Sequence, residues 1–246
     1  MIATIEFNNN SYKFDLSKPI DISIPLGDKT KKASAWYCED VIIEPVKMDG
    51  FIGAVAEGGS VNFRNINFNP HGNGTHTECV GHISKKVYSI NKTLKQYHAL
   101  AKVGSIRPKT LGKDLIIDEE LLSKVFPNSI EAVIIRTLPN VNKIGKNYTE
   151  TNPPYISVDG IKYLNSIGVK HLLIDLPSVD KEIDGGVLAA HHEFWQHPTN
   201  TQYEKTITEF VFINDQVSDG IYLLNLMIAP FENDATPSKP IIYECL

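Results

Sequence analysis

The sequence predicts an α/β protein, and one strand-helix-strand unit is the main reason. Residues 132–137 (Ala-Val-Ile-Ile-Arg-Thr) and residues 169–175 are short runs rich in β-branched residues, which is typical of strands buried in a sheet. Between them, residues 157–168 have apolar positions at helical spacing, with Ser157 as the N-cap and Gly168 as the stop. A helix between two buried strands is the unit from which α/β sheets are built.

Local patterns predict the other elements in chain order. Three asparagines, Asn8 to Asn10, separate two alternating runs and predict a hairpin over residues 2–14. Asp118 begins an acidic first turn that is followed by apolar residues at helical spacing, so we expect a helix over residues 118–125. The remaining elements are strands at 21–24, 41–46, 61–68 with a bulge at Arg64-Asn65, 206–213 and 220–228, and a short helix at 93–100.

Length and composition indicate one domain that acts on small molecules. The chain has 246 residues, 42% hydrophobic and 22% charged, and no composition shift marks a linker, so we expect a single domain over residues 1–246. Lys and Arg number 24 against 29 Asp and Glu, which gives a net charge of -5 without a basic stripe. We therefore expect a small-molecule substrate and no nucleic-acid partner.

The sequence also carries no sign of a membrane or of disulfides. No apolar run approaches membrane-spanning length, and the first residues lack the basic and apolar regions of a signal peptide. We therefore expect no membrane partner and a cytoplasmic location. Cys38, Cys79 and Cys245 form no CxxC pair, as expected of reduced thiols in the cytoplasm, and we expect Cys79 to be a buried structural thiol.

The strongest chemical signal is a cluster of four residues within twelve positions, namely His71, His76, Glu78 and His82. Imidazole nitrogens and a carboxylate are the ligands that hold Zn²⁺ or Mn²⁺ for hydrolysis, and an imidazole that is not a ligand can move protons near neutral pH. The alternative is a polar loop in which histidines cap turns. Three histidines and a carboxylate on one loop favour the metal site.

The spacing of this cluster predicts its local structure. His76 and Glu78 stand at i and i+2, so their side chains point the same way only in an extended segment, and a helical zinc-binding arrangement is excluded. We expect the site at the end of the strand over residues 61–68 and in the loop that follows it. Gly72 and Gly74 let that loop fold back on itself.

A second cluster lies downstream, in the run Ala-His-His-Glu-Phe-Trp-Gln-His over residues 190–197. Taken alone, adjacent histidines beside a glutamate are more typical of a solvated helix face. Together with the first cluster they indicate a metal centre that draws its ligands from distant segments. Asp175 and Asp180 precede this run and are candidates to orient a ligand histidine or to cap a turn.

The two clusters together resemble one family. Residues 71–82 are similar to the HxGTHxDxPxH signature of the metal-dependent cyclase-like hydrolases, whose members include bacterial kynurenine formamidase and isatin hydrolase. Five further segments are similar to motifs of that family in the same order: Asp21-Ile-Ser-Ile-Pro-Leu26, Ile174-Asp-Leu-Pro-Ser-Val-Asp180, Ala190-His-His192, the segment around Glu209, and Asp234-Ala-Thr-Pro237.

The resemblance implies a role for each candidate residue. His71, His76 and Glu78 would bind a first metal, and Glu78 would bridge to a second metal bound by Glu209 and His191, although the adjacent His192 is an alternative ligand. His82 would be the catalytic proton shuttle. One or two Zn or Mn ions per chain are implied. Trp36, in a segment that resembles the family's substrate-side loop, and Trp195 are candidate contacts for an aromatic or cyclic substrate, unless these rings belong to the core.

The resemblance further implies a fold and an activity. The fold would be a mixed β-barrel-like sheet of the swivelling β/β/α type with surrounding helices, assembled into a homodimer or homotetramer. The activity would be metal-dependent hydrolysis of an amide or cyclic amide, as in tryptophan catabolism, with water activated by the metal and His82 moving the proton. The alternatives are a non-hydrolytic cyclase or dehydratase of the same family and a metal-binding protein without turnover.

Four features depart from the family pattern. His71 stands five residues before His76, where four is usual. Glu78 replaces the usual aspartate, and Val80-Gly81 stands where the signature has proline. The segment between His191 and Glu209 is longer than the resemblance predicts.

Overall fold

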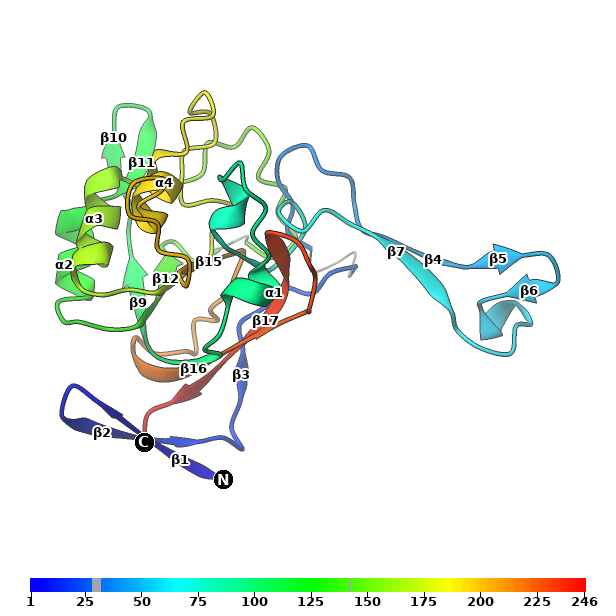
Figure 1. Cartoon of the computed structure of the whole chain (residues 1–246), viewed down its shortest axis with the longest axis horizontal. Helices are drawn as coiled ribbons and strands as arrows, with labels where there is room; N and C mark the ends of the chain where they lie inside the picture. The colour runs from blue at the N-terminus through cyan, green and yellow to red at the C-terminus, as the bar shows by residue number, and fades with distance from the viewer. Residues whose placement is uncertain (28–31, 142) are drawn as a thin grey trace.

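A closed sheet of seven strands forms the centre of the molecule (Figure 1). The computed structural model describes residues 1–27, 32–141 and 143–246. The first and last strands of the sheet pair with each other, and this pairing closes the barrel. The strands in order around the barrel are β16 (Gly220–Ile228), β9 (His98–Ile106), β12 (Ala132–Thr137), β14 (His171–Ile174), β15 (Thr206–Glu209), β8 (His76–Glu78) and β17 (Ala235–Glu244).

Parallel and antiparallel pairings are combined in this barrel. Strands β9, β12, β14 and β15 are parallel to one another, and the β12-helix-β14 unit predicted from the sequence lies among them. β12 is buried along its whole length, as its run of Val and Ile residues predicts for a strand covered on both faces. Strands β8, β17 and β16 complete the circuit by antiparallel pairing. The mixed barrel-like sheet expected from the sequence is confirmed.

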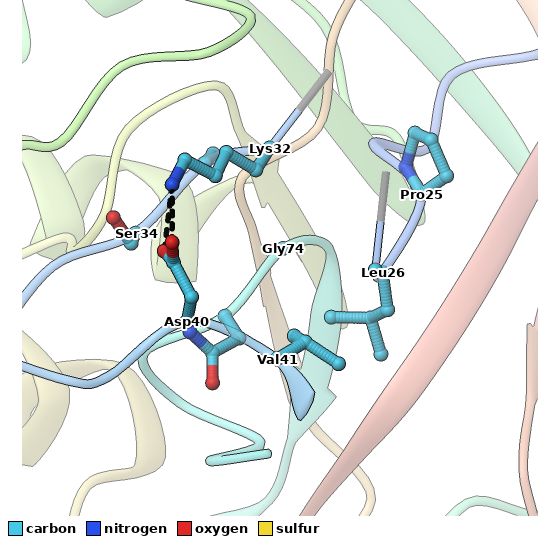
Figure 2. A pocket seen from close by; sticks show the side chains of 10 residues that line it. Pro25, Leu26, Lys32, Ser34, Asp40, Val41 and Gly74 are labelled. Carbon is cyan, nitrogen blue, oxygen red and sulfur yellow. Dashed lines mark hydrogen bonds and ion pairs between the residues drawn. The ribbon is translucent and has the colours of Figure 1, made fainter. Parts of the chain in front are cut away.

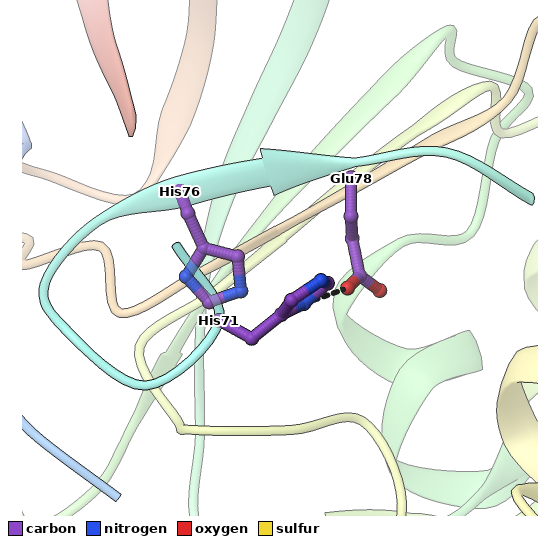
Figure 3. Close-up of side chains that lie close together, drawn as sticks. All are labelled: His71, His76 and Glu78. Atoms are coloured by element: carbon purple, nitrogen blue, oxygen red, sulfur yellow. Dashed lines mark ion pairs between the residues drawn. The ribbon is translucent and has the colours of Figure 1, made fainter. Parts of the chain in front are cut away.

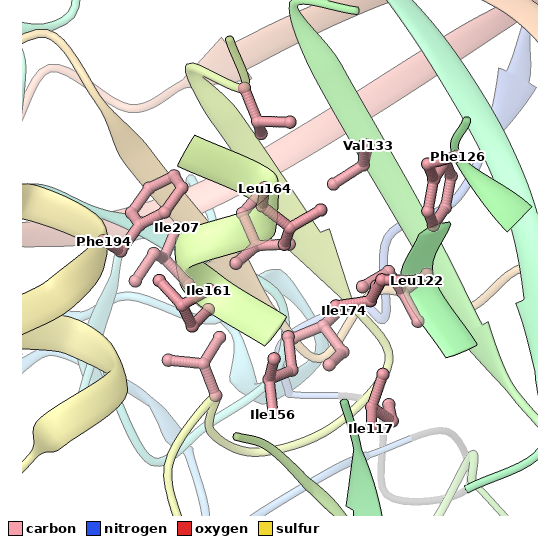
Figure 4. Packing of buried hydrophobic residues seen from close by; sticks show 14 of the residues in the cluster. Ile117, Leu122, Phe126, Val133, Ile156, Ile161, Leu164, Ile174, Phe194 and Ile207 are labelled. Carbon is pink, nitrogen blue, oxygen red and sulfur yellow. The ribbon is translucent and has the colours of Figure 1, made fainter. Parts of the chain in front are cut away.

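Three helices pack together on one side of the barrel (Figure 4). Ile161 and Leu164 of α3 are buried in one cluster with Phe194 of α4 and with Val133 and Ile174 of the parallel strands. Each of these side chains is removed from water, which stabilises the helix-on-sheet layer by about 1.5–3 kcal/mol per side chain. The helices are α2 (Glu119–Val125), α3 (Val158–Ser166) and α4 (Ala189–Trp195).

The helix starts follow the sequence signals in part. The helix expected at 118–125 is present as α2, and Asp118 caps it, because its carboxylate accepts the backbone N–H of Leu121 at 3.2 Å. Ser157 stands at the N-cap of α3 as predicted, but its hydroxyl donates to the carbonyl of Ile117 at 3.3 Å and does not cap the helix. In the described ranges, no helix is both long and apolar enough to cross a membrane.

The N-terminal hairpin is also confirmed. Its two-residue turn places Asn8 and Asn9 at φ angles of 49° and 62°, a left-handed conformation that asparagine tolerates. The expected strand at 21–24 is shorter than predicted, although Ile22 and Ile24 are buried. The smaller elements around the barrel are β1 (Ile2–Phe7), β2 (Asn10–Asp15), β3 (Ile20–Asp21), α1 (Ile90–Thr93), β10 (Lys109–Leu111), β11 (Asp114–Ile117) and β13 (Tyr155–Ile156).

One segment stands away from the barrel as an arm, which Figure 1 shows on the right. The expected strand at 41–46 is present here as β4, and the expected strand at 61–68 is reduced to β7, which pairs with it. β7 ends at Asn67, and His71 lies in the loop that follows it as expected, whereas His76 and Glu78 lie on the separate strand β8, which the sequence did not predict. The arm consists of β4 (Ile42–Pro45), β5 (Lys47–Met48), β6 (Phe51–Ile52), η1 (Val55–Glu57) and β7 (Arg64–Asn67).

The helix expected at residues 93–100 is wrong. Helix α1 ends at Thr93, and His98 already begins strand β9. β9 pairs on one side with β12 and on the other with β16, so two backbone hydrogen-bond ladders outweigh a local helical preference. The strand expected at 206–213 ends at Glu209, because Phe210 takes a φ of 55° that breaks the extended conformation.

Candidate active site

Strand β8 supplies the centre of the site. His76 and Glu78 are fully buried and project from the same face of this strand, as their i, i+2 spacing predicts (Figure 3). On the neighbouring strand β15, Glu209 is the register partner of His76, so its carboxylate reaches the same face. The Nε2 atom of His76 lies 3.4 Å from Oε2 of Glu209. These three candidate ligands therefore lie on strands β8 and β15, and the glycine-containing loop precedes β8.

His71 reaches this centre from the preceding loop despite the extra residue. The side chain of Asn69 accepts the backbone N–H of His71 at 2.9 Å and of Gly72 at 3.0 Å, which tightens the turn. Gly72 is required there because a Cβ would lie 2.2 Å from Sγ of Cys38. Nδ1 of His71 then lies 3.0 Å from Oε2 of Glu78, the contact drawn in Figure 3.

The downstream cluster reaches the same carboxylate through His191. Nε2 of His191 lies 3.1 Å from Oε1 of Glu78, and its Nδ1 lies 2.6 Å from Oδ2 of Asp180. Asp180 also accepts the backbone N–H groups of Ala190 and His191, which fixes the start of α4. His192 points elsewhere, with its Nδ1 3.0 Å from the carbonyl oxygen of His197. Successive helical residues diverge by about 100°, so only one of the adjacent histidines faces Glu78.

These residues fit a metal ion. Each of the three imidazoles directs one nitrogen towards the carboxylates, while its other nitrogen meets a fixed oxygen: the carbonyl of Gly74 for His76, Asp234 for His71 and Asp180 for His191. This is the arrangement of a metal-binding histidine. Nε2 of His76 is buried and has no hydrogen-bond partner in the part of the chain that the structure describes, as expected of an atom that would face a metal ion.

The electrostatics indicate what a metal must displace. Burial opposes a charge on His71, but hydrogen bonds to two carboxylates outweigh it and raise the pKa of His71 to about 10. The same balance raises the pKa of His191 to about 10. Burial also opposes the charge on Glu78, yet nearby His82 and the hydrogen bonds from His191 and His71 lower the pKa of Glu78 well below its usual value. Metal binding at neutral pH must therefore release imidazolium protons.

His82 lies beside the candidate ligands, and one of its ring nitrogens is within 4.8 Å of ligand atoms of Glu78 and His191. It ends the short 3₁₀ helix η2 (Val80–His82), and its side chain is 28% exposed. Its Nδ1 is 3.9 Å from Oε2 of Glu78 and 3.6 Å from Oδ2 of Asp234, longer than the contacts of His71 and His191. The imidazole of His82 is therefore partly exposed and lines the cavity beside the buried candidate ligands.

Asp234 is the residue of this site to which the sequence assigned no role. Its Oδ2 lies 2.7 Å from Nε2 of His71, although 163 positions separate the two residues. Burial opposes its charge, but the hydrogen bond from His71 and the neighbouring imidazole of His82 lower the pKa of Asp234 far below its usual range. The segment Asp234-Ala-Thr-Pro237 was noticed as a motif, and the carboxylate in it was the available signal.

A cavity of about 280 Å³ opens above the histidines. Trp36 lies on its wall, with a φ of 60° that is unusual for a bulky residue. Trp195 is instead fully buried, donates its indole N–H to the carbonyl of Lys205 at 2.9 Å, and packs its ring against His191. The lining residues are Trp36, His71, His82, Pro177, Ser178, Lys181, Glu182, Asp184, Leu188, His191 and Glu209.

A second hollow lies near the start of the arm (Figure 2). Its volume is about 40 Å³, much smaller than the histidine cavity. Its charged lining residues, Lys32 and Asp40, are paired with each other at 2.6 Å. We therefore place the site at the histidine cavity. Cys79 lies beneath that site with a fully buried side chain, and burial raises the pKa of its thiol, which suits a structural role.

Comparison with known proteins identifies relatives of this chain. The model of a family described as putative cyclase matches residues 14–181. A kynurenine formamidase of Bacillus anthracis is 29% identical over 231 residues, which cover 92% of this chain and 97% of the relative. The structure of a predicted metal-dependent hydrolase from Bacillus stearothermophilus matches with a TM-score of 0.65 at 15% identity. The match covers 92% of this chain and 98% of the hydrolase chain. Isatin hydrolase A from Ralstonia solanacearum has a TM-score of 0.65 at 13% identity, with coverage of 92% and 91%.

Proposed function

Because this chain belongs to the putative cyclase family, we propose that it is a metal-dependent hydrolase that cleaves the C–N bond of an amide or cyclic amide. The observation that supports this most directly is the convergence of three imidazoles on the carboxylates of Glu78 and Glu209, each with its far nitrogen held by a fixed oxygen. The names of the relatives, a kynurenine formamidase and an isatin hydrolase, support the choice of bond.

We propose two neighbouring metal positions, which the ligand geometry supports. His71, His76 and Glu78 place one ligand atom each within 4.8 Å of one another and would hold the first ion. The second ion would be held by Glu78, His191 and Glu209, since Oε1 of Glu209 lies 3.9 Å from Nε2 of His191. Zn²⁺ or Mn²⁺ bound there would polarise a carbonyl group and lower the pKa of water.

His82 would move the proton in this reaction. Its side chain borders the cavity, where it can reach both a water molecule and the leaving nitrogen of a bound amide. Departure of an amine requires that proton, because an unprotonated amide nitrogen is a poor leaving group. Cys79 is too deeply buried to act as a nucleophile, so water is the attacking species in this proposal.

The cavity suits a small, flat substrate. Its volume of about 280 Å³ is near the lower end of the range for ligand pockets. The indole of Trp36 offers one flat wall for an aromatic or cyclic group, and Leu188 offers an apolar one. Trp195 would act indirectly by supporting the ring of His191 from behind.

The arm supports the further proposal of a homodimer or homotetramer. A two-stranded ribbon is marginally stable in water, and this one exposes large apolar side chains such as Phe63 at 56% and Ile66 at 59%. We expect a second copy to cover them. Replacing both residues with serine should lower the mass measured by light scattering to that of a monomer, whereas Val87→Ser, at an exposed site away from the arm, should not. An unchanged mass in the double variant would contradict the proposed role of the arm.

The activity is tested by metal analysis followed by a substrate panel. Protein purified without added metal should contain one or two Zn or Mn ions per chain and should hydrolyse N-formylkynurenine, isatin or a simple cyclic imide. Metal without hydrolysis of any of these, but with cyclisation or dehydration of a related compound, would favour the non-hydrolytic alternative. Metal without any turnover would favour a binding protein, and the absence of metal would refute the site.

A further inference from the structure

The carboxylate of Asp234 lies between the ring of a proposed metal ligand and the ring of the proposed proton shuttle. Its Oδ2 is 2.7 Å from Nε2 of His71 and 3.6 Å from Nδ1 of His82. We propose that Asp234 is a positioning residue that aims His71 at the metal and keeps the ring of His82 beside it. This inference rests on the proposed metal site.

The backbone places Asp234 firmly at this point. Its carbonyl accepts the N–H of Cys79 at 3.0 Å, and the preceding Asn233 accepts the N–H of Ile90 at 2.8 Å. The next residue, Ala235, begins β17 as the register partner of Glu78 on β8. The position of Asp234 relative to Glu78 is therefore set by strand pairing and does not depend on a loose loop.

His71 needs such a partner because it comes from a loop that is one residue longer than the family pattern. The hydrogen bonds of Asn69 fix the backbone of this loop, but they leave the imidazole free to rotate about its side-chain bonds. A hydrogen bond from Nε2 to Asp234 removes that freedom and directs Nδ1 towards Glu78. A carboxylate on the outer nitrogen also fixes the tautomer that can bind a metal.

The same carboxylate orders the neighbouring ring. The imidazoles of His71 and His82 lie face to face, with centroids 4.3 Å apart and planes inclined by 30°. Oδ2 of Asp234 lies 2.7 Å from a nitrogen of His71 and 3.6 Å from a nitrogen of His82, so one carboxylate borders both rings. Asp234 thus links His71, the proposed metal ligand, to His82, the proposed proton shuttle.

The test measures zinc affinity by competition with a chromogenic chelator, so it does not require a known substrate. Asp234→Ala should weaken zinc binding about 10- to 100-fold, the range found when the outer partner of a ligand histidine is removed. Asp234→Asn should lose less, because its amide oxygen still accepts from Nε2 of His71. The matched control is Glu232→Gln, an exposed carboxylate on the same loop that pairs with Lys92 and should leave the affinity within twofold.

A double-mutant cycle separates positioning from a general structural effect. If Asp234 acts through His71, Asp234→Ala should weaken zinc binding less than twofold in a His71→Ala background. An equal loss with and without His71 would overturn the proposal, as would an unchanged affinity in Asp234→Ala. If His71→Ala alone leaves zinc affinity unchanged, the proposed metal site fails and this inference fails with it. If the protein binds zinc but hydrolyses no amide, the proposed function is refuted. The zinc affinities of the Asp234 variants would still decide whether Asp234 positions His71.

Discussion

Replacing His82 with alanine separates catalysis from metal binding. The side chain of His82 is 28% exposed, and its Nδ1 lies 3.6 Å or more from the carboxylates of Glu78 and Asp234. These distances exceed an ordinary hydrogen bond, so little binding or folding energy depends on the ring. We expect His82→Ala to fold normally and to keep its metal.

The expected loss is confined to turnover. Removing a general acid-base costs about two to four orders of magnitude in rate. At about 1.4 kcal/mol per tenfold, this corresponds to about 3 to 5.5 kcal/mol of lost transition-state stabilisation. By contrast, truncating a half-exposed side chain away from the core should change the free energy of unfolding by less than about 1 kcal/mol.

The assay compares kcat, metal content and thermal unfolding in the same preparations. The substrate is whichever compound of the panel the unaltered protein hydrolyses. His98→Ala, at an exposed histidine away from the site, is the matched control and should have normal kcat. Turnover within tenfold of normal in His82→Ala, or loss of metal along with activity, would show that His82 is not the proton shuttle.

Three further predictions follow from the ligands and from a buried histidine. His76→Ala should remove at least one metal ion, and full occupancy by elemental analysis would contradict the assignment. Glu209→Gln should lower the metal content while the protein stays folded, and Glu204→Gln, at an exposed position, should not. Burial lowers the pKa of His171 to about 4, whereas the same side chain in the unfolded protein has a pKa near 6.5. The unfolded state therefore binds a proton more readily, and the folded state should lose stability as the pH falls from about 6.5 towards 4. Urea unfolding at pH 5 and 7.5 with a chelator present should show that His171→Phe lacks this part of the pH dependence, and an unchanged dependence would refute it.

Several features of the molecule could be predicted from local sequence because they depend on local geometry. The i, i+2 spacing of His76 and Glu78 requires an extended segment for both side chains to meet, and strand β8 provides it. The acidic start at Asp118 and the buried run at residues 132–137 act through hydrogen bonds and burial within a few residues of themselves. The barrel itself was implied by the resemblance to the cyclase-like hydrolases and not by local geometry.

Other features were misjudged because distant pairing decided them. Residues 98–100 have a local helical preference, but two flanking strands make them part of β9. The strand expected to lead into the site belongs to the arm. Trp195 is typical of a substrate-binding ring in sequence, yet the packing of α4 against the barrel buries it completely.

The sequence by itself determined which residue types form the site, because imidazole nitrogens and carboxylate oxygens can bind a metal or a proton whatever the fold around them. Only the tertiary structure decided which of them meet. The register between β8 and β15 brings Glu209 to His76, the start of α4 turns His191 and not His192 towards Glu78, and the pairing of β17 with β8 delivers Asp234 to His71. A local pattern repeats every two or 3.6 residues, whereas these contacts join segments more than a hundred residues apart, and only the closed sheet fixes their alignment.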